Sequence, residues 1–221
     1  MKNSDEKPAT PIDWQVWHEG YESDTPLRRR LEIVQRRIGE FLDGFNGSPV
    51  RVVSMCAGEA RDLLGALDNR KRRDITGRLV ELDPELAGRA RAHAAALGLS
   101  DLEVRVGDAG ETASYSGAVP ADLVLVCGVL GNISDADIAR TLHALPMFAA
   151  RGATVVWTRH RLEPDMTVNI RRWLEESGFE NSFYDKVPDS DTLGTVGGAV
   201  FRGETQPLID EHLFTFIRKT L

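Results

Sequence analysis

Short apolar segments alternate with helix-like segments from residue 50 onward, and this alternation constrains the fold more than any other feature of the sequence. Runs of β-branched residues predict strands, whereas apolar residues spaced three and four apart predict helices. Strands are predicted at 50–55, 77–82, 102–109, 121–130 and 153–159, and helices at 60–69, 84–97, 134–145 and 166–178. Alternating strands and helices predict a doubly wound α/β domain, in which a parallel sheet carries helices on both faces.

The end of the chain departs from this alternation. Residues 181–187, 193–203 and 211–217 resemble strand segments that are separated by turns, with no helix between them. Two closing strands without a crossover helix favour an antiparallel hairpin at one edge of the sheet. Neither a repeat nor a linker interrupts residues 50–221, so one domain is the simplest interpretation.

The N-terminal part of the chain precedes the alternating pattern. Residues 1–12 are polar and contain two prolines, which predicts a disordered tail. Residues 13–48 are expected to form a helical cap or lid, and the domain itself is expected at 49–221. The cap is indicated by the aromatic cluster Trp14, Trp17, His18 and Tyr21, and by helical spacing of Leu27, Leu31, Val34, Ile38 and Phe41.

Charge and cysteine content exclude several classes of protein. A formal net charge of −7 argues against a broad surface for nucleic acid or anionic membranes. No apolar run reaches the length of a membrane span, and the polar N-terminus lacks the apolar region of a signal peptide. Two cysteines are too few for a disulfide framework or a four-ligand zinc site, so no metal is expected. We therefore expect a cytoplasmic monomer or homodimer whose partner is a small-molecule substrate.

The turn SMCAGEAR, residues 54–61, connects the first predicted strand to the first predicted helix. Gly58 would let the backbone approach a ligand, but one glycine is equally consistent with an ordinary turn. The next two strands end in Glu81, which can accept hydrogen bonds from ribose hydroxyls, and in Asp108, which can accept one from an adenine amino group. Asp83 is expected to cap the helix that follows it. Each acid alone is consistent with a solvated strand end, but together they mark the edge where such sheets bind ligands.

Because Gly58, Glu81 and Asp108 follow one another at the ends of three successive predicted strands, residues 50–221 resemble the class I S-adenosylmethionine (SAM)-dependent methyltransferases. The first turn of that family reads acid-x-Gly-x-Gly-x-Gly, and the matching residues here are Ser54, Cys56, Gly58 and Ala60. The middle glycine is retained, and small residues stand at the other two glycine positions. Residues 80–94, 107–109 and 120–134 resemble the motifs that bind the ribose, flank the adenine and end the fourth strand.

The resemblance implies a Rossmann-like, mostly parallel seven-stranded sheet with an antiparallel C-terminal edge hairpin and an N-terminal helical cap. It also implies SAM as the cofactor. The implied cofactor-binding residues are Cys56, Ala57, Gly58, Glu81, Leu82, Asp108, Ala109, Cys127 and Gly128, joined by Tyr21 from the cap.

Methyl transfer requires an acceptor that is held in line behind an already activated methyl group, and a general base only where the acceptor loses a proton. His160 is the candidate base and Asn132 the candidate that orients the acceptor. Substrate binding is expected from Trp14, His18, Asn132, Arg159 and His160. Cys56 and Cys127 are expected to be two small buried residues rather than a redox pair.

The expected function is therefore methyl transfer to an oxygen, nitrogen or carbon atom of a small molecule, because the chain has neither a separate recognition domain nor a basic stripe. One alternative is a protein that binds SAM or its demethylated product, S-adenosylhomocysteine (SAH), without catalysis. Methylation of RNA or protein is a less favoured alternative. A nicotinamide-binding Rossmann domain is disfavoured because its third glycine would fall at Arg61.

Overall fold

The computed structural model describes residues 25–188 and 194–217, which form a seven-stranded sheet in the order β3-β2-β1-β4-β5-β7-β6. The strands are β1 (Val50–Met55), β2 (Ile75–Glu81), β3 (Leu102–Val106), β4 (Ala121–Val126), β5 (Ala149–Arg159), β6 (Phe179–Lys186) and β7 (Thr195–Phe201). The first five strands pair in parallel, whereas β7 pairs antiparallel with both β5 and β6. This arrangement confirms the predicted doubly wound sheet with its antiparallel C-terminal hairpin.

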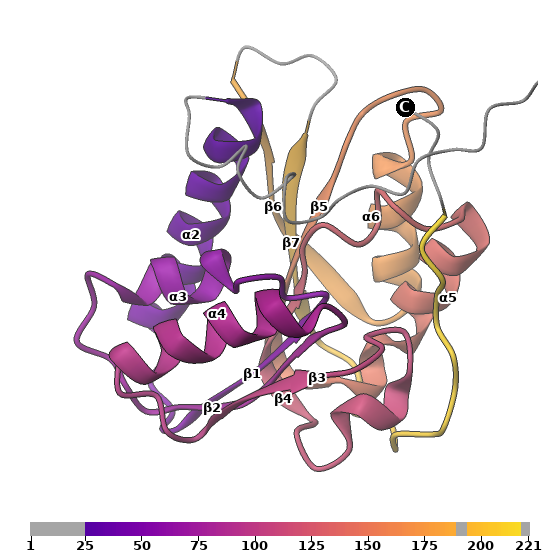
Figure 1. Ribbon diagram of the computed structural model, residues 1–221. Helices are drawn as coiled ribbons and strands as arrows, with labels where there is room; N and C mark the ends of the chain where they lie inside the picture. The colour runs from indigo at the N-terminus through magenta and orange to yellow at the C-terminus, as the bar shows by residue number, and fades with distance from the viewer. Residues whose placement is uncertain (1–24, 189–193, 218–221) are drawn as a thin grey trace, which may run out of the picture.

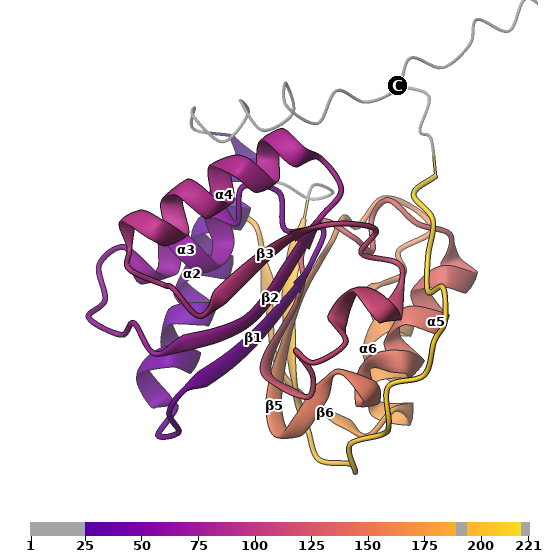
Figure 2. The ribbon, with the colours of Figure 1, turned by 60° about the horizontal axis from the view of Figure 1, so that its bottom comes forward.

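Helices cover both faces of the sheet (Figure 1). One face carries α2 (Pro26–Gly44), α3 (Arg61–Leu67) and α4 (Pro84–Ala96), and the other carries the 3₁₀ turn η1 (Thr112–Tyr115), α5 (Asp135–Ala144), the 3₁₀ turn η2 (Leu145–Met147) and α6 (Thr167–Glu176). The rotated view in Figure 2 separates these two layers. The three-layer packing follows from the alternating sequence, because each amphipathic helix buries its apolar side on the sheet.

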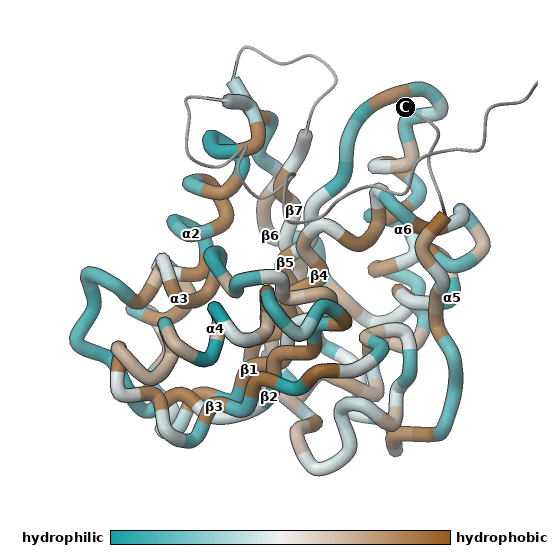
Figure 3. The backbone as a smooth tube through the Cα atoms, in the orientation of Figure 1, coloured by the Kyte–Doolittle hydropathy of each residue, from teal (hydrophilic) through white to brown (hydrophobic). Residues whose placement is uncertain are grey.

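Two apolar clusters form the core, one on each face of the sheet. Strand β4 contributes to both, since Val124 and Val126 belong to one cluster and Leu123 and Leu125 to the other. This explains why the strand reads as a continuous apolar run: neither of its faces meets water. In Figure 3 the central strands are largely brown, whereas the outer loops are largely teal.

Local capping fixes where the helices begin. The Asp83 carboxylate accepts from the backbone N–H groups of Glu85 and Leu86 and so caps α4, as expected. Ser134 caps α5, because its hydroxyl accepts from the Asp137 N–H at 3.1 Å.

The predicted strand at 211–217 is wrong. After β7 the chain turns back, and residues 204–217 run in extended form beside α5 (Figure 1). Their sole ladder contact among the described residues is an isolated antiparallel bridge between Glu111 and His212. The apolar residues of this segment reflect burial of Leu213 and Phe214 in the core on one face of the sheet, and this burial does not require a sheet neighbour.

Other departures concern boundaries. Strand β4 ends at Val126 rather than at residue 130, because the chain turns at Gly128, whose φ is 77°. Residues 1–24 lie outside the described residues, and with them the predicted tail and the aromatic cluster of the cap. Among the residues that the structure describes, no helix has the length and apolar character needed to span a membrane.

Candidate functional site

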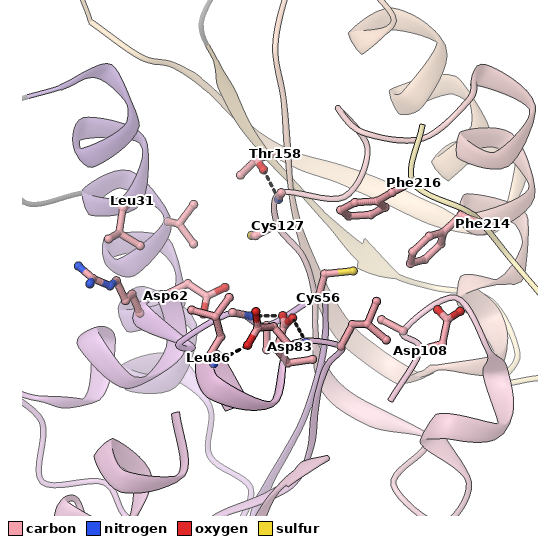
Figure 4. Close-up of a pocket in the computed structure, with 18 of the residues that line it drawn as sticks. Leu31, Cys56, Asp62, Asp83, Leu86, Asp108, Cys127, Thr158, Phe214 and Phe216 are labelled. Carbon is pink, nitrogen blue, oxygen red and sulfur yellow. Dashed lines mark hydrogen bonds between the residues drawn. The ribbon is translucent and has the colours of Figure 1, made fainter. Parts of the chain in front are cut away.

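A cavity of about 640 Å³ opens at the carboxyl ends of β1 to β4 (Figure 4). Strand order reverses here, since β1 lies between β2 and β4, and ligands of open α/β sheets bind at such a point. Its wall consists of Arg30, Leu31, Val34, Cys56, Ala57, Gly58, Arg61, Asp62, Glu81, Leu82, Asp83, Leu86, Asp108, Ala109, Cys127, Gly128, Thr158, Phe214, Thr215 and Phe216. The volume is in the range of cavities that hold small molecules and cofactors.

The turn from β1 to α3 has an unusual backbone. Cys56, Gly58 and Ala60 all adopt left-handed conformations, with φ of 53°, 57° and 55°. These are the three positions at which the resembling family carries glycine. A residue with a side chain is strained in this region by about 1–2 kcal/mol, and such strain is concentrated at functional sites. The turn therefore keeps the shape of a glycine-rich loop although two of its glycines are absent.

This strain gives a test of the turn. Cys56→Val should lower the free energy of unfolding by about 1–3 kcal/mol, because a β-branched side chain tolerates positive φ worst. The free energy of unfolding of Cys56→Gly should stay within about 1 kcal/mol of the wild-type value, since relief of strain offsets lost packing. Urea unfolding measures both. Cys127→Val is the matched control, because Cys127 is also half-buried but has no positive φ. Equal costs for the two valine variants would contradict the strain assignment.

Glu81 closes the turn from the neighbouring strand. Its side chain is buried, with 8% of the residue exposed, and its two carboxylate oxygens accept from backbone N–H groups. Oε2 accepts from Gly58 at 2.7 Å and Oε1 from Asp83 at 2.8 Å. A carboxylate has about four lone-pair sites, so it can still accept from hydroxyl groups in the cavity. The adjacent Leu82 is 70% exposed on the cavity wall, although it is a large apolar residue.

Asp108 and Ala109 form the wall beyond β3. Asp108 Oδ1 accepts from the Gly110 N–H at 2.7 Å, and the Ser114 hydroxyl donates to the Asp108 carbonyl at 2.7 Å. The buried Tyr115 hydroxyl donates to the Ala109 carbonyl at 3.0 Å. These bonds fix the loop while the Asp108 side chain remains exposed at the cavity.

Cys127 and Gly128 follow β4 and form another part of the cavity wall. The Gly128 N–H donates to the Thr158 hydroxyl of β5 at 2.8 Å, so the two strand ends are tied together (Figure 4). Both cysteines are free, and burial raises the pKa of each thiol. We expected both cysteines to be buried, but each is only half-buried, because it faces the cavity.

Asp62 is a cavity residue that the sequence analysis did not single out. Its Oδ1 accepts from the Leu63 N–H at 2.7 Å at the start of α3. Burial raises the pKa of this carboxyl from its usual 3.8 to about 6, because the walls of the cavity remove it from bulk water. Its signal in the sequence was weak: an acid in the first turn of a helix is common for electrostatic reasons alone.

Asn132, Arg159 and His160 do not belong to the cavity wall. The Asn132 side chain donates to the Gly128 carbonyl at 2.6 Å and so closes the loop after β4. Arg159 is buried beneath the same loop, where its guanidinium donates to the Leu130 carbonyl, and burial lowers its pKa. The His160 ring lies against Gly131, and its Nδ1 accepts from the Leu162 N–H at 3.3 Å. Trp14, His18 and Tyr21 fall outside the described residues.

One group of side chains in the described part of the chain has the composition of a metal site: Asp108, Glu111 and His212, whose ligand atoms lie within 4.8 Å of one another. Both ring nitrogens of His212 are already engaged, with Glu111 at 2.8 Å and with the Thr215 hydroxyl at 2.9 Å. We therefore interpret this group as an anchor for residues 211–215.

Fold and cavity together define the class of structure: the chain has the fold of the class I SAM-dependent methyltransferases. Magnesium protoporphyrin IX methyltransferase (ChlM) from Synechocystis PCC 6803, solved with bound SAM, is similar at a TM-score of 0.66 and 13% identity, over 85% of this chain and 90% of that one. A TehB-like SAM-dependent methyltransferase from Corynebacterium glutamicum gives 0.57 and 14%, over 86% and 96%.

An O-methyltransferase family protein from Burkholderia thailandensis is also similar, with a TM-score of 0.59 and 14% identity, over 78% of this chain and 57% of that one. No model of a protein family matches the sequence. No curated protein matches it either. The similarity to these enzymes is therefore one of fold, and the function has to be argued from the site.

Proposed function

We propose that this protein is an enzyme that transfers a methyl group from SAM to a small molecule. One observation carries the proposal: every described residue that the family resemblance implied for the cofactor lines the same cavity, at the edge where the strand order reverses. Residues far apart in sequence, from Cys56 to Gly128, meet there. We infer that residues 49–221 form the cofactor-binding domain and that residues 13–48 cap it, because Arg30, Leu31 and Val34 of α2 contribute to the wall.

The donor and acceptor groups present fit SAM along its length. The Glu81 carboxylate, held by two backbone N–H groups, would accept from the ribose hydroxyls. Leu82 and Ala109 supply apolar surface for the adenine, and Asp108 an acceptor for its amino group. When bound, SAM supplies a methyl group already activated by the positively charged sulfur.

We infer that Asp62 binds the positively charged amino group at the methionine end of SAM. The acid that begins the family's first turn is replaced here by the buried Ser54, so the usual negative charge is absent from that position. Asp62 offers a negative charge on the cavity wall, on the side of Leu31 of α2 (Figure 4). A cation at this carboxylate would favour its charged form and offset the cost of desolvation.

The protein's own contribution to the reaction is orientation and exclusion of water. Leu31 and Val34 make part of the wall apolar, which suits an apolar acceptor held behind the methyl group. Asn132, Arg159 and His160 remain proposals for the acceptor side, behind the loop that follows β4. His160 can serve as a base near neutral pH for an acceptor that must lose a proton.

Turnover of SAM that carries a labelled methyl group, offered with a panel of small metabolites, tests the proposal. We expect label to appear in a small acceptor with equimolar SAH. The Glu81→Ala variant serves as the negative control for the same preparation. Tight binding of SAM without transfer to any acceptor would support the alternative, a binding protein that senses SAM or SAH.

A further inference from the structure

The segment after the sheet, residues 204–217, is called here the C-terminal strap. It returns to the carboxyl edge of the sheet along α5 and is held by backbone hydrogen bonds along its length (Figures 1 and 2). The Thr112 N–H donates to the Glu211 carbonyl at 3.0 Å, the Leu213 N–H to Gly110 at 2.8 Å, and the Ile217 N–H to Asn132 at 2.8 Å. The strap thus follows the rim of the cavity from β3 to β4.

Side chains add to this attachment. The buried Thr112 hydroxyl donates to the Ile209 carbonyl at 2.7 Å and accepts from the Glu211 N–H at 2.8 Å. Gly110 allows the close approach, because a Cβ there would lie 2.4 Å from the Phe214 carbonyl oxygen. Gly110 directly follows Ala109 of the cavity wall. The strap is therefore fitted to the loop on which the nucleoside half of the proposed cofactor site depends.

Near its end the strap carries two aromatic residues that line the cavity, Phe214 and Phe216. Their ring centroids are 6.0 Å apart, and the rings are tilted by 32°. Figure 4 shows both rings on the Asp108 side of the cavity, across from Leu31 of α2. Phe214 is buried and packs into the core, whereas Phe216 is only partly buried and packs against it. Phe216 thus presents part of its side chain to the cavity.

We propose that the C-terminal strap is a part of the cofactor site and that Phe216 stacks on the adenine ring of SAM. This inference rests on the proposed function and extends it to a segment outside the sheet. Aromatic rings bind nucleobases by stacking, because every base offers a flat π-face. The strap is bonded to the residues just after Asp108 and Ala109, and this favours adenine over the methyl acceptor as its ligand.

The test compares SAH and adenosine as calorimetric ligands of the full chain. Phe216→Ala should lower the affinity for SAH and for adenosine by the same factor, about 5- to 100-fold, because both ligands carry the adenine. Phe216→Leu keeps apolar volume but not the flat ring, and should lose part of this affinity. Thr112→Val should lower the affinity for both ligands by about 3- to 10-fold, because the strap loses two hydrogen bonds. This effect is expected although Thr112 does not line the cavity. Val168→Ala, in an exposed residue of α6 outside both the strap and the cavity wall, is the control and should bind as the wild type does.

The outcomes separate this inference from the function on which it rests. If the wild type binds neither ligand, the proposed function itself fails. If the wild type binds both, and the Phe216 and Thr112 variants bind as tightly, the strap inference alone is overturned. A loss for SAH without a loss for adenosine would place Phe216 beside the methionine end or the acceptor, and would also overturn stacking on adenine.

Discussion

Replacing Glu81 with alanine is expected to weaken SAM and SAH binding by at least about 100-fold, because hydrogen bonds to a charged group contribute about 1.5–3 kcal/mol each. The loss has two sources. The ribose loses its acceptor, and the N–H groups of Gly58 and Asp83 lose the carboxylate that orients the turn. Isothermal titration calorimetry with SAH measures the effect.

Two further variants make this prediction specific. Glu81→Gln keeps one carbonyl oxygen but turns an NH₂ group toward a backbone N–H, so we expect it to bind SAH less tightly than the wild type and more tightly than Glu81→Ala. Glu103→Ala removes an acid from the neighbouring strand, where its exposed carboxylate pairs with Arg78 at 2.7 Å outside the cavity. It should leave affinity unchanged. Wild-type affinity in Glu81→Ala would remove Glu81 from the site.

Asp62→Asn should move stability and binding in opposite directions. The ionised carboxylate is disfavoured in the folded protein, where burial raises its pKa to about 6, so the amide should stabilise the fold at pH 8 by about 1–3 kcal/mol. The amide can still accept from the Leu63 N–H, so the start of α3 is kept. Affinity for SAM should fall, because the amino group of the methionine loses its counter-charge.

The pH dependence of this variant follows from the direction of the pKa shift. The folded state binds a proton at Asp62 more tightly than the unfolded state, so the contribution of Asp62 to stability declines as pH rises from about 4 to about 6. The advantage of Asp62→Asn should therefore appear above about pH 6 and vanish below about pH 4. Urea unfolding across this range measures it. Asp68→Asn, in an exposed acid at the end of α3, is the control. Equal stability and SAM affinity of Asp62→Asn and the wild type would contradict the assignment.

The sheet could be predicted because its information is local. Apolar runs such as residues 121–126 and the caps at Asp83 and Ser134 fix the elements, and the handedness of crossovers limits their order. The acids could be predicted equally well, since Glu81 ends β2 and Asp108 lies two residues after the end of β3. Sequence alone could not show that Cys56 and Ala60 keep the left-handed backbone of the glycines they replace.

What could not be predicted depends on long-range packing. The end of the strap is rich in apolar and aromatic residues, as strands are, yet its place is decided by Gly110 and Thr112, about 100 positions earlier in the chain. Asp62 looked like an ordinary first-turn acid until the cavity around it was known. Arg159 ends β5 and His160 follows it, but Arg159 is buried beneath the loop after β4 and does not line the cavity.

Titration of the wild-type protein with SAH in a calorimeter tests the central claim most directly. Saturable binding at one site per chain is predicted, with the affinity strongly reduced in Glu81→Ala and unchanged in Glu103→Ala. Absence of binding to both SAH and SAM would contradict the assignment of this cavity as a methyltransferase cofactor site.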